Sequence, residues 1–292
     1  MIERRRFLAC AAALGAWPAL RSRAAAAPPD TRIPFTPSNG YVTFPLTIAG
    51  IAKPVVAALN TGFTFSFIDS KRWTALGGRH LVPTGNYAST TDALSIGGAP
   101  LAPTKIALID GLDGDDAKLG VTADVLLGFD AFAGRIVEID FPHAIVSVRA
   151  APASAAAAAD RGAAAFTYEQ YQPHSPKLLT FDGFTFDGAP IAVQLDTMWT
   201  GNAILFPTKF ATAPAFAPAN APARTYEEGA LSAVTVKSVT FSGKPLGTDV
   251  VAYVPAGKAS IPTTRLAGVV GTGMFANRVV TLDFGAGTIA VS

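Results

Sequence analysis

An apolar run that ends in a polar triplet occurs twice in the chain. It reads Val55-Val56-Ala57-Ala58-Leu59-Asn60-Thr61-Gly62 the first time and Ile191-Ala192-Val193-Gln194-Leu195-Asp196-Thr197-Met198 the second. Aliphatic and β-branched residues dominate both runs, and a segment with glycine and proline precedes each, which predicts a strand, a turn and a strand before the triplet. Because both copies end alike, we expect the two triplets at equivalent places in two copies of one unit, facing each other.

Two further blocks follow each triplet in the same order. The first predicts a hairpin that turns around glycine, and the second predicts an apolar strand that ends in glycine, with another strand after it. The corresponding segments are 94–101 with 239–246, 125–132 with 268–275, and 137–141 with 280–284. Three blocks that recur in one order indicate an internal duplication.

The rest of the chain is typical of an all-β protein. Short β-type runs separated by Gly, Pro and Asn recur along its 292 residues, half of which are apolar, and few stretches carry an apolar helical period. The Ala-rich segment 151–165 lies between the two copies and predicts a surface linker. We therefore expect an N-terminal lobe at 28–150 and a C-terminal lobe at 166–292.

The first 27 residues, Met1 to Ala27, predict a secretory signal. Arg4-Arg5-Arg6 precedes an apolar run from Phe7 to Leu20, which is shorter than the roughly 20 residues that span a bilayer. We expect cleavage near Ala26 and no stable membrane insertion afterwards. The arginine pair before Phe-Leu resembles a twin-arginine signal, which implies a periplasmic or secreted protein.

Charge and cysteine content exclude several partners and chemistries. The chain has 23 basic and 21 acidic residues; the signal takes away five arginines and one glutamate, which leaves 18 and 20 and a net charge of −2. That balance gives no reason to expect nucleic acid as a partner. Cys10, the single cysteine, leaves with the signal, so the mature chain has no disulfide, no thiol nucleophile and no cysteine metal site.

The duplicated unit resembles one lobe of a retropepsin-like or pepsin-like aspartic peptidase. The resemblance rests on an apolar strand that ends in an Asp-Thr-Gly type triplet, the glycine hairpin, and the apolar-apolar-Gly strand before an Ile-Asp-Phe type strand. It covers nearly the whole mature chain and implies two homologous β-barrel lobes packed around a central cleft, and a monomer. In that family each lobe offers one aspartate, and the two carboxylates share a proton, so that one activates water while the other polarises the scissile carbonyl.

The resemblance also implies roles for eight positions. Two are the dyad positions, two are threonines that buttress the dyad loops through hydrogen bonds to the opposite lobe, and four face the substrate, including tyrosines of two flap hairpins. The catalytic set is Asn60, Asp196, Thr61 and Thr197, and the substrate-binding set is Gly62, Met198, Tyr87 and Tyr226. For the two tyrosines, an ordinary position on the surface is the open alternative.

Two departures from the family pattern weaken the activity that it implies. Asn60 stands where aspartate is expected, and an amide cannot hold or exchange the shared proton at neutral pH. Met198 stands where glycine is expected and crowds or reshapes the other half of the dyad. Loss of one member of a catalytic unit often costs on the order of a thousandfold in rate. Asp130 is a candidate replacement carboxylate, whereas Asp69 is expected to be structural or on the surface.

The leading hypothesis is an exported aspartic-peptidase-like protein with weak or no proteolytic activity, whose cleft binds an extended peptide or an unfolded protein. One alternative is an active aspartic-type endopeptidase that uses Asp196, and another is a non-catalytic envelope scaffold. We expect no cofactor and no metal, since His80, His143 and His174 are scattered singly and the acidic segment 110–116 lacks EF-hand spacing. The segment 271–276 fits a dinucleotide fingerprint, but a β-type run follows it where a helix is required.

Overall fold

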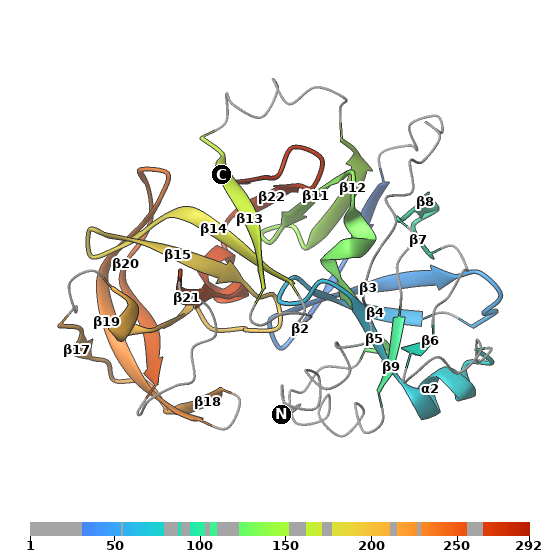
Figure 1. Ribbon diagram of the computed structural model, residues 1–292, viewed down its shortest axis with the longest axis horizontal. Helices are drawn as coiled ribbons and strands as arrows, with labels where there is room; N and C mark the ends of the chain where they lie inside the picture. The colour runs from blue at the N-terminus through green and yellow to red at the C-terminus, as the bar shows by residue number, and fades with distance from the viewer. Residues whose placement is uncertain are drawn as a thin grey trace.

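Strands dominate the part of the chain that the computed structural model describes. These residues are 31–53, 55–78, 87–88, 94–102, 106–109, 123–151, 162–170, 177–210, 215–226, 229–255 and 265–292. They form one nine-stranded and one 14-stranded sheet, both curled (Figure 1). The all-β prediction is therefore confirmed. The signal segment 1–27 lies outside the described residues, as do His80, His174 and the acidic segment 110–116.

The nine-stranded sheet belongs to the first copy of the repeat. Its strand order is β6-β9-β5-β10-β4-β3-β7-β8, with β2 paired to β3. The bounds are β2 (Thr36–Ser38), β3 (Tyr41–Ile48), β4 (Val55–Asn60), β5 (Ser66–Asp69), β6 (Tyr87–Ala88), β7 (Leu94–Ile96), β8 (Ala99–Pro100), β9 (Ile106–Ile109) and β10 (Val125–Gly128). Helix α2 (Ser70–Ala75) follows β5, and the 3₁₀ helix η1 (Phe129–Phe132) follows β10.

The 14-stranded sheet holds the second copy and also joins the two copies. Its order is β1-β12-β11-β22-β23-β13-β14-β15-β21-β16-β20-β19-β17, with β18 paired to β19. The bounds are β1 (Thr31–Pro34), β11 (Arg135–Asp140), β12 (Ile145–Ala150), β13 (Ala164–Gln170), β14 (Lys177–Phe186), β15 (Ala189–Leu195), β16 (Ala203–Leu205), β17 (Ala217–Pro218), β18 (Arg224–Tyr226), β19 (Gly229–Phe241), β20 (Lys244–Pro255), β21 (Leu266–Val270), β22 (Val279–Asp283) and β23 (Thr288–Val291). Two further 3₁₀ helices are η4 (Pro207–Lys209) and η5 (Thr272–Phe275).

We call β1 to β12 the first lobe and β13 to β23 the second lobe. The lobes meet where β11 and β22 pair antiparallel, with Glu138 opposite Thr281 near the middle of the ladder. On either side the order is symmetric, since the hairpin β11–β12 with β1 mirrors the hairpin β22–β23 with β13. Six strands, three from each lobe, thus form one continuous layer between the lobes, visible at the upper centre of Figure 1.

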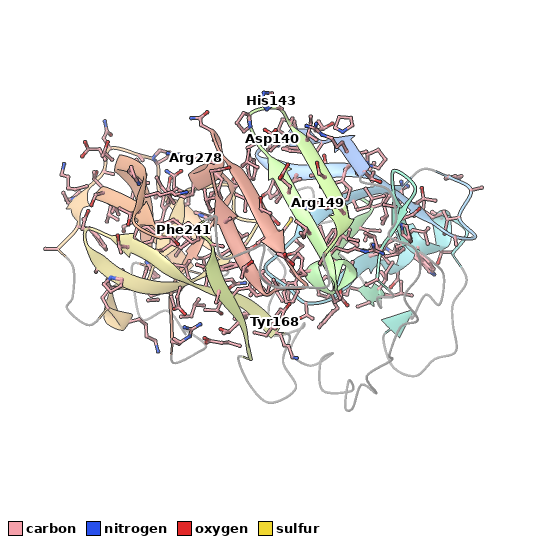
Figure 2. All side chains as sticks on the ribbon, turned by 90° about the horizontal axis from the view of Figure 1, so that it is seen from above. Asp140, His143, Arg149, Tyr168, Phe241 and Arg278 are labelled. Atoms are coloured by element: carbon pink, nitrogen blue, oxygen red, sulfur yellow. The ribbon has the colours of Figure 1, made fainter. Side chains whose placement is uncertain are left out.

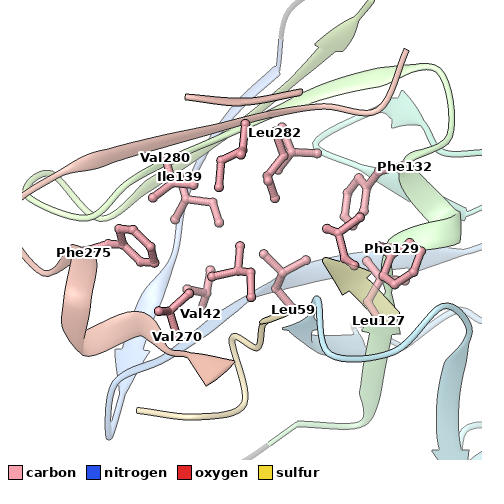
Figure 3. Packing of buried hydrophobic residues seen from close by; sticks show 14 of the residues in the cluster. Val42, Leu59, Leu127, Phe129, Phe132, Ile139, Val270, Phe275, Val280 and Leu282 are labelled. Atoms are coloured by element: carbon pink, nitrogen blue, oxygen red, sulfur yellow. The ribbon is translucent and has the colours of Figure 1, made fainter. Parts of the chain in front are cut away.

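The hydrophobic core lies directly beneath this shared layer. Ile139, Val280 and Leu282 point from β11 and β22 toward Val42, Leu59 and Val270 on the strands below (Figure 3). All six side chains are at most 1% exposed. Because Leu59 immediately precedes Asn60 and Val270 pairs with the residue before Asp196, burial of this layer fixes the strands that carry both triplets.

The repeated hairpins are confirmed where the glycines predicted them. The turn between β7 and β8 places Gly98 at φ +86°, and the turn between β19 and β20 places Gly243 at φ +77°, a conformation that glycine adopts without steric cost. The two strands before each triplet, β3–β4 and β14–β15, also form antiparallel hairpins as predicted.

Two features differ from the sequence-based expectations. Helix α2 was not foreseen; Asp69 begins it by accepting hydrogen bonds from the amides of Lys71 and Arg72, which confirms a structural role for Asp69. Ala164 and Ala165, assigned by sequence to the linker, already pair with β23 as the start of β13. Most of that linker, 152–161, lies outside the described residues.

Surface polar groups at one end of the shared layer bond to residues of neighbouring strands. His143 Nδ1 lies 2.9 Å from the Asp140 carboxylate in the turn that joins β11 to β12 (Figure 2). Arg278 donates from Nη2 to the carbonyl of Pro245 at 3.1 Å. His143, the one described histidine that the sequence singled out, therefore has a side-chain partner at the end of β11.

Candidate active site at the paired triplets

The two triplets sit at the ends of equivalent strands. Asn60 ends β4 and lies opposite Gly128 of the parallel strand β10. Leu195 ends β15 opposite Val270 of the parallel strand β21, and the Asp196 amide donates to the Val270 carbonyl at 3.0 Å. A third strand, β5 in one lobe and β16 in the other, pairs antiparallel on the far side of β10 or β21. The sequence repeat thus becomes a structural repeat around the triplets.

Gly128 and Gly271 allow the chain to cross itself beside each triplet. A Cβ on Gly271 would lie 2.0 Å from the carbonyl oxygen of Trp199, and one on Gly128 would lie 2.5 Å from the carbonyl oxygen of Phe65. Neither backbone atom can move aside like a flexible side chain. The apolar-apolar-Gly motif therefore serves close backbone approach in both lobes.

Thr61 and Thr197 join the lobes through a reciprocal set of buried hydrogen bonds. Each threonine amide donates to the other threonine's Oγ1, both at 3.1 Å. Thr61 Oγ1 donates to the carbonyl of Leu195 at 3.1 Å, and Thr197 Oγ1 donates to the carbonyl of Leu59. Both side chains are at most 1% exposed. The arrangement is the one that the resemblance predicted, and it holds the two loops against each other.

Asn60 and Asp196 converge on Gly62. Asn60 Oδ1 accepts the Gly62 amide at 3.1 Å, and Asp196 Oδ1 accepts the Met198 amide at 2.8 Å, so each dyad position binds the third residue of its own triplet. A Cβ on Gly62 would lie 2.7 to 2.8 Å from the carboxylate of Asp196. Gly62 is therefore the place where that carboxylate approaches the first lobe, and Asn60 and Asp196, only 3% and 6% exposed, lie on either side of it.

Met198 and Gln194 occupy the surroundings of the two dyad positions. Met198 is partly buried and packs against the apolar cluster of the first lobe that includes Ala58 and Leu126. Gln194 is fully buried, and its Nε2 donates to the carbonyl of Gly62 at 2.9 Å. Gln194 was missed by the sequence analysis, although a lone polar residue inside an apolar strand, two positions before Asp196, is a signal that could have found it.

Two more contacts between the lobes flank the triplets. Thr64 Oγ1 in the first lobe donates to the carbonyl of Lys177 at 2.8 Å, and Thr272 Oγ1 in the second donates to the carbonyl of Gly40 at 2.8 Å. Both threonines lie just beyond a motif of the repeat, and each reaches the start of the other lobe's hairpin. Neither threonine could be singled out from the sequence, since their partners are backbone atoms far along the chain.

For the remaining predicted site residues, Tyr87, Tyr226 and Asp130, the structure gives the backbone position. Tyr87 lies in β6 and Tyr226 in β18, but their side chains lie outside the described part of the structure. The amide of Asp130, in η1, donates to the carbonyl of Thr64 at 2.8 Å, four residues past Asn60. The structure therefore brings Thr61, Thr197, Gly62 and Met198 together around the dyad positions, and the flap and replacement roles stay predictions.

The chemistry open to this pair is narrower than that of two carboxylates. Asp196 can accept or donate a proton, whereas the Asn60 amide offers an acceptor and two donors that do not titrate. Two carboxylates held together share a proton that cycles during peptide hydrolysis, and an Asn–Asp pair has only one carboxyl group to carry it. The pair can still hold a carbonyl or hydroxyl group by hydrogen bonds.

Comparison with known proteins supports the fold. The structure is similar to the crystal structure of an aspartic proteinase from Irpex lacteus, with a TM-score of 0.51 and 12% sequence identity, over 90% of this chain and 97% of that one. At this identity the similarity shows a shared fold. No protein-family model and no curated sequence matches the chain. Among the described helices, none has the length and apolar character needed to cross a bilayer.

Proposed function

We propose that this chain is an exported peptide-binding protein of aspartic-peptidase-like fold, with weak or no proteolytic activity. The observation that carries the proposal is the contrast at the triplets: the reciprocal threonine bonds are complete, while Asn60 replaces one of the two carboxylates that hydrolysis needs. The backbone frame, that is, the two triplet loops held together by Thr61 and Thr197, is retained, while the carboxyl group that would carry a proton at position 60 is missing. This combination favours binding of an extended peptide between the lobes over its cleavage.

The second candidate is an active aspartic-type endopeptidase. It is favoured by Asp196 itself, whose carboxylate is buried against Gly62 at the junction of the lobes. In this version Asn60 is a hydrogen-bond partner of Asp196, or Asp130 supplies the second carboxylate. The cost of losing one dyad carboxyl, on the order of a thousandfold, makes this the weaker candidate.

The deciding experiment measures both cleavage and binding. Purified protein without residues 1–27 is incubated with an unfolded protein from acidic to neutral pH, beside Asn60→Asp and Asp196→Ala, and peptide binding is measured by calorimetry. Asp249→Ala is the matched control, because it removes a carboxylate that is 67% exposed and paired with Lys237. We expect peptide binding without efficient cleavage, weaker binding in Asp196→Ala, and no change in the control.

Three other outcomes would each change the assignment. Cleavage by the wild type that Asp196→Ala abolishes would establish the endopeptidase. Cleavage gained only by Asn60→Asp would show that the missing proton carrier alone silences the site. A wild type that neither cleaves nor binds peptide would leave the envelope scaffold as the function.

Export and oligomeric state belong to the same proposal. The arginine pair Arg5-Arg6 before Phe7-Leu8 supports export by the twin-arginine route, and both triplets come from one chain, which supports a monomer. Changing both arginines to lysine should hold the protein in the cytoplasm with residues 1–27 uncleaved, as mass spectrometry of the purified protein would show. An unchanged periplasmic fraction would contradict this route.

A further inference from the structure

The two lobes differ at two positions beside each dyad residue. In the first lobe the residue two places before the dyad position is Ala58, and the third triplet residue is Gly62, so both are small. In the second lobe the equivalent residues are Gln194 and Met198, and both are long. Side chains two residues apart point to the same face of a strand. Ala58 therefore shares a face with Asn60, and Gln194 points to the same side of its strand as Asp196.

Gln194 reaches from the second lobe into the first. Its Nε2 donates to the carbonyl of Gly62 at 2.9 Å, so it fixes the third residue of the opposite triplet. Its Oε1 is buried and has no hydrogen-bond partner in the described structure, and the same holds for Oγ1 of Thr180, its cross-strand neighbour. Burial of an unpaired acceptor costs free energy, so apolar packing does not explain why a glutamine occupies position 194. Its hydrogen bond to the carbonyl of Gly62 does.

Met198 also reaches from the second lobe into the first. Its amide is bound to Asp196 Oδ1, and its side chain packs against the first-lobe cluster of Tyr41, Ala58, Phe67, Ala107 and Leu126. Ala58 in this cluster is the counterpart of Gln194. Both long side chains thus come from the second lobe, Gln194 from the strand before Asp196 and Met198 from the triplet of Asp196.

We propose that Gln194 and Met198 are complementary positioning residues, each filling from its own element the space that a small residue leaves in the other lobe. Gln194 binds the carbonyl of Gly62, and Met198 packs against the cluster that contains Ala58. Since Ala58 and Asn60 share a strand face, Met198 in this proposal supplies position 60 with an apolar environment, which an amide tolerates better than a carboxylate. The proposal rests on the proposed function, in which the dyad is degenerate, and it makes the two departures, Asn60 and Met198, a coupled pair.

A stability cycle on positions 58 and 198 tests the complementary filling. Ala58→Gln alone should lower the Tm because it competes with Met198 for one space, and Met198→Gly alone should lower it by leaving that space empty. The Tm of the double variant should lie well above the value expected from adding the two single decreases. The reason is that the new glutamine can bind the backbone carbonyl at position 198 as Gln194 binds Gly62. Met198→Leu, which keeps the apolar volume, is the control with little expected change.

Additive effects in this cycle would overturn the proposal. If Ala58→Gln fails to fold by itself while the double variant folds, the rescue supports it as strongly as a measured Tm. If neither folds, glutamine at position 58 cannot take the place of Met198, and the proposal is again overturned.

A second measurement follows the carboxyl group introduced by Asn60→Asp. Its pKa, read from carboxyl carbon shifts in NMR, should be higher in Asn60→Asp than in Asn60→Asp/Met198→Gly by roughly one unit or more, because the methionine withholds water from the charged form. The titratable groups from the packed elements are Asp196, Tyr41 and Asp130, and all three are the same in both variants. Equal pKa values would overturn the coupling between positions 60 and 198.

These two measurements are separable from the proposed function. Neither needs a bound peptide or any cleavage, so a protein that binds no peptide can still show the coupling. Conversely, additive Tm changes at positions 58 and 198 together with intact peptide binding would overturn only the proposed coupling and leave the proposed function standing. Where Asn60→Asp does yield cleavage, adding Met198→Gly should raise it at least tenfold near neutral pH, and an equal rate would count against the proposal.

Discussion

The two halves of the candidate site share their backbone frame and differ in their chemistry. Both have a glycine where a strand passes beside the triplet loop, and both have a threonine that binds the opposite lobe. They differ at the dyad position, Asn60 against Asp196, and at the third triplet residue, Gly62 against Met198. The frame and the proton chemistry are therefore separable properties of this fold.

The shared residues are those on which two parts of the backbone depend at once. Each threonine hydroxyl serves an amide and a carbonyl of the other lobe, and each crossing glycine admits a neighbouring carbonyl. The Asp196 carboxylate, by contrast, accepts the Met198 amide of its own loop. Exchange of Asp for Asn keeps the loop bond, as the Gly62 amide shows by binding Asn60 Oδ1 at 3.1 Å.

The largest loss of stability is expected from substituting Gly128 or Gly271, the glycines at which the chain crosses itself beside each triplet. Gly271→Ala would bring a Cβ to 2.0 Å from the Trp199 carbonyl oxygen, against 2.5 Å to the Phe65 carbonyl for Gly128→Ala. Since both obstacles are backbone, we expect each variant to lose about 4 kcal/mol or more, with Gly271→Ala the worse. Guanidinium unfolding followed by circular dichroism measures the loss.

Gly50→Ala is the control for this pair. Gly50 has φ +82° with open space around its Cβ position, so alanine there costs only the strained backbone, about 1 to 2 kcal/mol. If Gly271→Ala proves as mild as Gly50→Ala, the two chain segments can separate, and the frame is looser than the shared motif implies.

An intermediate effect is expected from the threonine pair. Thr61→Val and Thr197→Val keep the side-chain volume and each remove two hydrogen bonds to the backbone of the other lobe, which leaves buried backbone groups unpaired and should cost about 2 to 3 kcal/mol per variant. Because both residues belong to one network, the double variant should lose less than the sum.

Equal losses from the two lobes would show that the symmetry extends to energetics. Thr185→Val is the reference, since its hydroxyl bonds only that of Thr240 at a part-buried place away from the triplets. A loss no larger than that reference would mean that the reciprocal bonds contribute little to holding the lobes together. Urea titration monitored by tryptophan fluorescence measures all four variants.

The fold was largely predictable because its determinants are local. Aliphatic runs such as Val55–Leu59, the Gly97-Gly98 turn and the crossing glycines each carry their own signal, and the duplication let one copy interpret the other. The threonine bonds could be expected from the resemblance, and the structure has them. Local pattern and global fold agree at these positions, as they do in foldable sequences.

The environment of the dyad could not be predicted in the same way. Gln194 binds a carbonyl in the other lobe, 132 residues away in sequence, and the packing of Met198 on the Ala58 cluster likewise depends on how the lobes face each other. Neither contact leaves a periodic trace. A long side chain at position 198 could be noticed as a departure, but the space that it fills becomes visible only once Ala58 and Gln194 are seen as counterparts.

The smallest effect concerns the only α-helix in the described structure and its counterpart. After β5 the Asp69 carboxylate, 2% exposed, accepts the amides of Lys71 at 2.8 Å and Arg72 at 3.2 Å, and six residues of α-helix follow. After β16 the equivalent place holds Phe206, which has no capping side chain, and only the 3₁₀ turn of Pro207–Lys209 follows. The comparison indicates that a side-chain acceptor at this point decides whether a helix forms.

Asp69→Ala should therefore cost about 1 kcal/mol, whereas Asp69→Asn keeps an acceptor and should cost only a few tenths. Hydrogen exchange at the amides of Lys71 and Arg72 is the sharper measurement, because it reports on the helix end and not on the whole lobe. Exchange should accelerate in the alanine variant and stay near wild type in the asparagine variant. Equal exchange in both variants would mean that α2 is stabilised by the burial of Trp73, which is 2% exposed, and not by the Asp69 cap. Phe206→Asp would then fail to lengthen the turn in the second lobe, and the difference between the lobes would come from packing instead.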